Sequence, residues 1–115
     1  MDVQGVMLDL IEHTSFNRLD GKRVRADLDK FRNLWQSALI TSPLIGIVLR
    51  DLPSGIYNVD TIYVLAAPGR RKELDRLVRK WNASEIEWFE GKAAQEMLGK
   101  YGPDYEPEVV QIWWD

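Results

Sequence analysis

The chain has 115 residues, of which 45% are hydrophobic and 29% are charged; its formal net charge is −3 and it contains no cysteine. This length fits a single domain of about 100–150 residues, and so large an apolar share excludes an intrinsically disordered chain. The lack of cysteine excludes disulfide bonds, Fe–S clusters and thiolate nucleophiles. We therefore expect residues 1–115 to fold as one domain.

The sequence shows no targeting or membrane-spanning segment. Residues 1–5 lack the basic start and the apolar stretch of a signal peptide. The longest apolar run, residues 43–49, is much shorter than the roughly 20 residues that span a bilayer. We therefore expect a soluble, cytoplasmic protein with no membrane partner.

Two amphipathic helices are predicted in the first part of the chain. The first helix should end near His13, because the residues that follow favour turns. Its apolar positions, spaced i, i+3, i+4, i+7 and i+8, are Val3, Val6, Met7, Leu10 and Ile11. A second stripe predicts a helix from about Asp20 to just before Pro43, with Val24, Leu28, Phe31, Trp35 and Leu39 on one side. We expect residues 1–42 to form a helical layer over a sheet.

Residues 43–115 alternate between strand and helix patterns. Short β-branched or alternating runs bounded by turn residues predict strands, and amphipathic runs between them predict helices. The predicted strands are 44–49, 60–65, 85–89 and 108–114, and the predicted helices are 70–80 and 93–100. The run 85–89 alternates glutamate with apolar residues, which is typical of a one-sided strand near the edge of a sheet.

These elements predict an α/β fold, with an α+β arrangement as the alternative. Two N-terminal helices precede a β-(turn)-β-α-β-α-β run, which would form a mixed sheet of three or four strands covered by helices. Successive strand–helix–strand units imply parallel neighbours joined by right-handed crossovers. The pattern leaves the order of the strands open.

Negative charge and tryptophan both concentrate near the end of the chain. Residues 84–115 hold eight acidic and two basic side chains, whereas residues 1–83 hold ten acidic and thirteen basic ones. Trp113 and Trp114 are consecutive in a predicted strand, so they point to opposite faces and one of them can meet a partner. We predict a non-enzymatic protein-interaction or regulatory domain that binds a partner protein or a second copy of itself. The candidate anchors are Trp88, Trp113 and Trp114, with Glu85, Glu87 and Glu108 for charge complementarity.

The turn at residues 68–72 indicates an alternative function. Helix N-termini carry free N–H groups and the positive end of the helix dipole, so they attract phosphate. The alternative is therefore a phosphate- or nucleotide-binding domain whose anion site comprises Gly69, Arg70, Arg71 and Lys72. Neither a G-x-G-x-x-G nor a G-x-x-x-x-G-K-[ST] pattern accompanies this turn.

The remaining polar residues predict no further chemistry. His13 is the only histidine, and no serine lies in a Gly-x-Ser-x-Gly segment, so no catalytic residue is predicted. No group of residues has the spacing of a metal or cofactor motif, and we expect neither. The basic side chains of residues 18–32 alternate with aspartates, which argues against a nucleic-acid partner.

Overall fold

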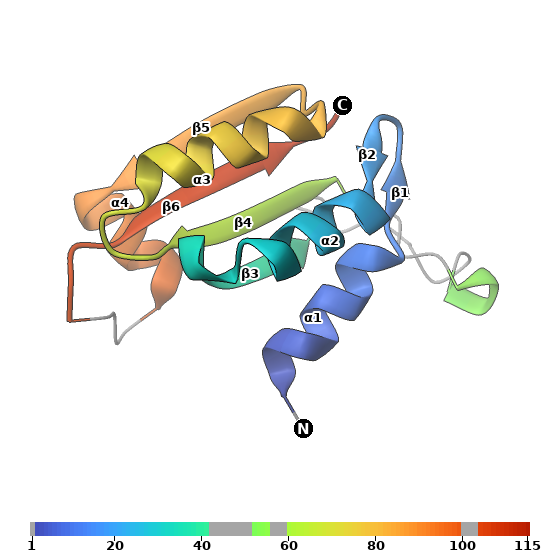
Figure 1. Cartoon of the computed structure of the whole chain (residues 1–115), viewed down its shortest axis with the longest axis horizontal. Helices are drawn as coiled ribbons and strands as arrows, with labels where there is room; N and C mark the ends of the chain where they lie inside the picture. The colour runs from blue at the N-terminus through green and yellow to red at the C-terminus, as the bar shows by residue number, and fades with distance from the viewer. Residues whose placement is uncertain (1, 42–51, 56–59, 100–103) are drawn as a thin grey trace.

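The computed structural model describes residues 2–41, 52–55, 60–99 and 104–115. These residues form four α-helices, a short hairpin and a four-stranded sheet (Figure 1). The helices are α1 (Val3–Glu12), α2 (Gly21–Lys30), α3 (Arg71–Val78) and α4 (Gly91–Leu98). The hairpin is β1 (Ser15–Phe16) with β2 (Leu19–Asp20), and the sheet contains β3 (Trp35–Thr41), β4 (Thr61–Ala66), β5 (Glu85–Glu90) and β6 (Glu108–Trp113). Short 3₁₀ turns occupy Arg32–Leu34, Leu52–Ser54 and Arg79–Trp81.

The sheet has the strand order β3-β4-β6-β5, and every neighbouring pair is antiparallel. The predicted class, helices packed on a sheet, is confirmed in its α+β form, but the expected mixed sheet with parallel neighbours is wrong. Strands β4 and β5 run in the same direction, yet β6 lies between them and runs opposite to both. Strand β6 takes this central position because Val109, Val110 and Ile112 bury apolar side chains on both of its faces.

Residues 35–41 form a strand, which corrects the predicted second helix. Helix α2 begins at Gly21, as expected, but it ends at Lys30. Trp35 is buried in the core, whereas Leu39 is 47% exposed on the opposite face of the sheet, so the two do not share a stripe. A run of aromatic and aliphatic residues tolerates either backbone form, and pairing with β4 selects the extended one. The helical layer therefore ends near residue 34 rather than residue 42, and the strand expected over 44–49 lies outside the described residues.

The sheet has two unlike faces. Helices α2 and α3 lie over one of them, here called the inner face, while α1 runs beside the β3 edge (Figure 1). The main core lies between these helices and the inner face, and it includes Leu28, Leu74, Ile62 and Ile112. Among the described elements, α4 covers the other face, here called the outer face, at the end of the sheet where α3 begins (Figure 1).

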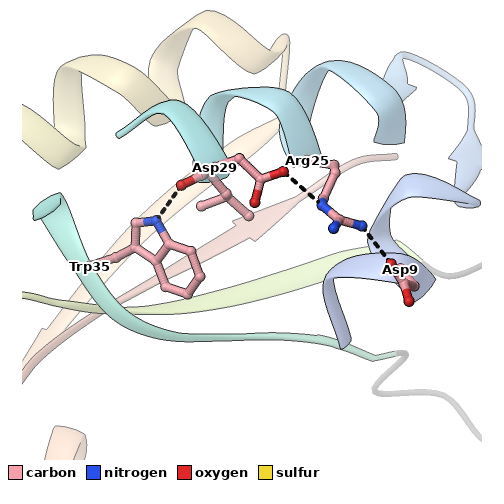
Figure 2. A network of polar contacts seen from close by, with 5 residues as sticks. Asp9, Arg25, Asp29 and Trp35 are labelled. Atoms are coloured by element: carbon pink, nitrogen blue, oxygen red, sulfur yellow. Dashed lines mark hydrogen bonds and ion pairs between the residues drawn. The ribbon is translucent and has the colours of Figure 1, made fainter. Parts of the chain in front are cut away.

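The two N-terminal helices are fastened together and to the sheet. Arg25 of α2 donates to Asp9 of α1 at 2.7 Å and to Asp29 at 3.0 Å (Figure 2). The indole N–H of Trp35 donates to the carbonyl oxygen of Leu28 at 2.9 Å, which ties the start of β3 to α2. Gly21 makes the close approach of the helices possible, because a Cβ atom there would lie 2.1 Å from a backbone oxygen of α1.

Candidate functional site

The β3 edge of the sheet is closed by α1. The side-chain amide of Gln4 donates to the carbonyl oxygen of Ala38 at 2.8 Å, and its own oxygen accepts from the Ala38 N–H at 3.0 Å. The sulfur of Met7 accepts from the N–H of Ile40 at 3.4 Å. Ala38 and Ile40 direct their backbone groups away from β4, so α1 occupies the positions that an added strand would use.

The β5 edge is arranged differently, and one hydrogen bond inside the sheet defines its geometry. The N–H of Trp114 donates to the carbonyl oxygen of Asp60 at 3.0 Å, so the even-numbered residues of β6 direct their backbone groups toward β4. The odd-numbered residues of β6 then face β5, where their partners are Glu85, Glu87 and Phe89. The backbone groups of Ile86 and Trp88 consequently point away from the sheet. Among the described residues, no hydrogen bond to these outward groups is found.

Acidic side chains line this open edge. Glu85 and Glu87 are exposed on the outer face, where they lie beside Trp113 and Gln111 of β6. Glu90 is also exposed, at the point where β5 passes into α4. The edge therefore combines backbone groups that bond to no other described residue with a surface of negative charge.

Helix α3 holds the open edge strand in place from the inner face. Arg71 forms ion pairs with Glu90 at 3.0 Å and with Glu108 at 2.9 Å, and its guanidinium lies 4.8 Å from the ring centroid of Trp88. The indole N–H of Trp88 donates to a carboxylate oxygen of Asp75 at 2.8 Å. These contacts tie β5, β6 and α3 together.

The electrostatics of Asp75 follow from this packing. Burial by itself raises the pKa of Asp75, but hydrogen bonds from Arg79 and Trp88 and the positive charge of Arg79 and Arg71 outweigh that effect. The pKa of Asp75 therefore lies below its ordinary value, and the carboxylate stays ionised under Trp88 at neutral pH.

The predicted tryptophan anchors have three different environments. Trp114 is 1% exposed, and its indole N–H donates to the carbonyl oxygen of Trp81 at 3.0 Å, so it belongs to the core and presents no ring to a partner. Trp88 is half-buried against α3 on the inner face. Trp113 is half-buried on the outer face, beside Glu85. Of the three, only Trp113 lies with the exposed glutamates.

The predicted anion site is not assembled as an open cradle. Gly69 has φ of +74° and follows Pro68 in a tight turn closed by a hydrogen bond from the Arg70 N–H to the Ala67 carbonyl oxygen. Arg70 forms an ion pair with Glu73 at 2.8 Å. Arg71 is engaged by the two glutamates described above, while Lys72 is exposed on α3. The helix that was expected here is present, but carboxylates already bind Arg70 and Arg71.

The outer face also carries a shallow apolar groove that the sequence pattern did not indicate. It has a volume of about 400 Å³ and lies between β3, β4 and α4, with Leu39 and Met97 as its most exposed apolar residues. Its lining includes Leu39, Tyr63, Leu65, Met97, Leu98 and Val109. Leu39 could not be placed there from the sequence, because its spacing also suits a helix.

Within residues 2–41, 52–55, 60–99 and 104–115, no group of three or more metal-binding side chains is positioned to hold an ion. No helix in this described part of the chain is long and apolar enough to cross a membrane. Comparison with protein-family models, with curated proteins and with solved structures finds no match. The fold itself therefore defines the class of protein: an α+β domain with a four-stranded antiparallel sheet, whose acidic β5 edge pairs with no other described strand.

Proposed function

We propose that this chain is a non-enzymatic protein-interaction domain that binds a partner polypeptide along the edge of β5. The proposal rests on one difference between the two edges of the sheet, which is the hydrogen bonding of their outward backbone groups. Gln4 of α1 binds the outward N–H and C=O of Ala38 in β3, and Met7 accepts from the N–H of Ile40. In contrast, no described residue bonds to the outward groups of Ile86 and Trp88 in β5. Exposed strand edges are sites of pairing with other chains, and proteins protect the edges that they do not use.

Two further features support binding at this edge. The contacts of Arg71 and Asp75 with β5 order the strand beforehand, which lowers the entropic cost of association. The glutamates of β5 oppose non-specific aggregation, since charged side chains on an edge repel identical edges. Both features are typical of an edge that pairs selectively.

The phosphate-binding alternative has less support. A phosphate at the start of α3 would have to compete with Glu73 for Arg70 and with Glu90 and Glu108 for Arg71. These ion pairs already complement the cations that suggested the site. We therefore favour the interaction domain.

The proposal is tested by comparing the polypeptides that the native chain and two variants retain from a cell extract. Glu87→Lys reverses a charge on the edge, and Asp104→Lys makes the same change on an exposed bend outside the sheet. We expect polypeptides retained by the native chain to be lost with Glu87→Lys and kept with Asp104→Lys, as quantified by mass spectrometry. Equal retention by all three chains, or retention of nothing that depends on residue 87, would contradict binding at β5.

A further inference from the structure

We infer that the partner of β5 is an extended segment with alternating basic and apolar residues, which adds to the sheet as a fifth strand. This inference rests on the proposed function and specifies the chemistry of the partner. An added strand would form hydrogen bonds with the outward N–H and C=O groups of Ile86 and Trp88. Side-chain recognition would then follow from which residues of β5 lie on each face.

The outer face determines the charge of the partner. Glu85 and Glu87 are two residues apart, so their side chains lie on the same face, and both are exposed. Residues of an added strand directly opposite them lie about 4.5–5.5 Å away between Cβ atoms, within reach of an ion pair. Lysine or arginine at every second position of the partner would match these two carboxylates.

The inner face determines which residues of the partner alternate with the basic ones. Ile86 and Trp88 point to this face and are only half-buried, because no strand covers their outer side within the described residues. Apolar, β-branched residues at the alternate positions of the partner would complete the burial of both side chains. On this side the carboxylates that contact Arg71 and Arg79 are already engaged in ion pairs, so they attract a second row of cations less than the outer face does.

Neither sheet edge of a second copy of the chain offers alternating basic and apolar residues. Pairing of β5 with β5 would bring the glutamates of two copies together, and like charges on adjacent strands are destabilising. The β3 edge of a second copy is covered by Gln4 and Met7. Charge complementarity therefore favours a basic partner over self-association.

The test uses synthetic heptapeptides and the full chain. The probe is Lys-Val-Lys-Val-Lys-Val-Lys, and its controls are Glu-Val-Glu-Val-Glu-Val-Glu and the block sequence Lys-Lys-Lys-Lys-Val-Val-Val, which has the same composition as the probe. Fluorescence anisotropy gives the dissociation constants, and amide hydrogen exchange reports whether Ile86 and Trp88 become protected. The protein variants are Glu85→Gln with Glu87→Gln, and Asp104→Asn as the control with an equally conservative change outside the sheet.

We expect the alternating basic peptide to bind about tenfold or more tightly than either control peptide and to protect the Ile86 and Trp88 amides. The double glutamine variant should weaken binding by about 3- to 30-fold, and Asp104→Asn by less than about twofold. Equal binding of the block peptide would show that bulk charge suffices and would overturn strand addition. Equal binding of the acidic peptide would overturn the proposed charge pattern.

The remaining outcomes separate this inference from the proposed function. If the basic peptide fails to bind while the extract partner still depends on Glu87, the partner chemistry is wrong and the interaction edge stands. If neither the peptide nor any extract component depends on β5, both are wrong. A dimer in sedimentation analysis with protected Ile86 and Trp88 amides would identify a second copy as the occupant and overturn the inference.

Discussion

The side chain of Gln4 pairs with the backbone of Ala38 through two hydrogen bonds, donating at 2.8 Å and accepting at 3.0 Å. A neighbouring strand would make the same two bonds, so one helix residue takes the place of a strand partner at this position. This relationship distinguishes the two edges of the sheet, and the proposed binding site at β5 depends on it.

Loss of this side chain should open the β3 edge. With Gln4→Ala, we expect the Ala38 N–H to lose its protection from hydrogen exchange and the free energy of unfolding to fall by about 1 kcal/mol. Self-association should also appear in sedimentation experiments, because a second edge becomes available. Val3→Ala is the control on the same helix, since Val3 is 75% exposed. Unchanged exchange at Ala38 would show that Gln4 does not close the edge.

Amide exchange along β5 should alternate from residue to residue. The N–H groups of Glu87 and Phe89 point toward β6 and should be protected, whereas those of Ile86 and Trp88 should exchange faster by roughly an order of magnitude or more. Residue-resolved exchange by NMR measures this directly. Uniform protection along the strand in the isolated chain would mean that its outer edge is already covered.

The two consecutive tryptophans should differ in their contribution to stability. Trp114→Ala removes a ring that is 1% exposed and should lower the free energy of unfolding by about 3–5 kcal/mol. Trp113→Ala removes a half-buried ring from the outer face and should cost about 1–2 kcal/mol. Denaturant titration of both variants provides the comparison. Similar losses would contradict the assignment of Trp114 to the core and Trp113 to the surface.

Asp75 should stabilise the fold in a pH-dependent way. Its pKa in the folded chain lies below the unfolded value of about 3.9, so its contribution is present above that value and is lost as the pH falls through the folded pKa. We expect Asp75→Asn to lower the free energy of unfolding by about 1 kcal/mol at pH 7. The difference from the native chain should shrink below about pH 4.

Urea titrations at several pH values measure this difference. Asp104→Asn, a substitution on an exposed bend, is the control for the change from aspartate to asparagine. A gap between the native chain and Asp75→Asn that stays constant from pH 7 to pH 2 would contradict the role assigned to the ionised carboxylate.

Gly21 should tolerate no side chain. Gly21→Ala would place a Cβ atom 2.1 Å from the carbonyl oxygen of Ile11 and 2.5 Å from that of Thr14, and both obstacles are backbone atoms. We expect a loss of about 2–3 kcal/mol, measured by thermal or denaturant unfolding. Gly5→Ala is the matched control, because it lies within α1 and the three atoms nearest to its Cβ would all belong to the side chain of Asp2. That control should be neutral or stabilising by up to about 1 kcal/mol.

Local patterns predicted most of the elements in the second half of the chain. The expected strands 60–65, 85–89 and 108–114 correspond to β4, β5 and β6, and the expected helices 70–80 and 93–100 correspond to α3 and α4. These patterns suffice because hydrophobic period and turn residues act over a few positions. The edge position of β5 also follows from its sequence. A central strand that is covered on both faces would have to bury the alternating glutamates, whereas an edge strand leaves them exposed.

The candidate site was only partly visible in the sequence. Glu85 and Glu87 were predicted as interface residues, and both lie exposed on the open edge. Trp114 was predicted with them, but consecutive strand residues face opposite sides, and the sequence does not say which side the helices cover. Gln4 gave no signal, because its role arises only when α1 packs beside a strand more than thirty residues away.

The sequence by itself determined an α-and-β domain and an acidic, one-sided strand at residues 85–89. Tertiary structure decided that residues 35–41 pair with β4 rather than continue a helix, and that β6 enters the sheet between β4 and β5. It also decided that α1 closes one edge of the sheet and not the other. These outcomes depend on contacts between distant segments, whose burial and hydrogen bonding outweigh local preference.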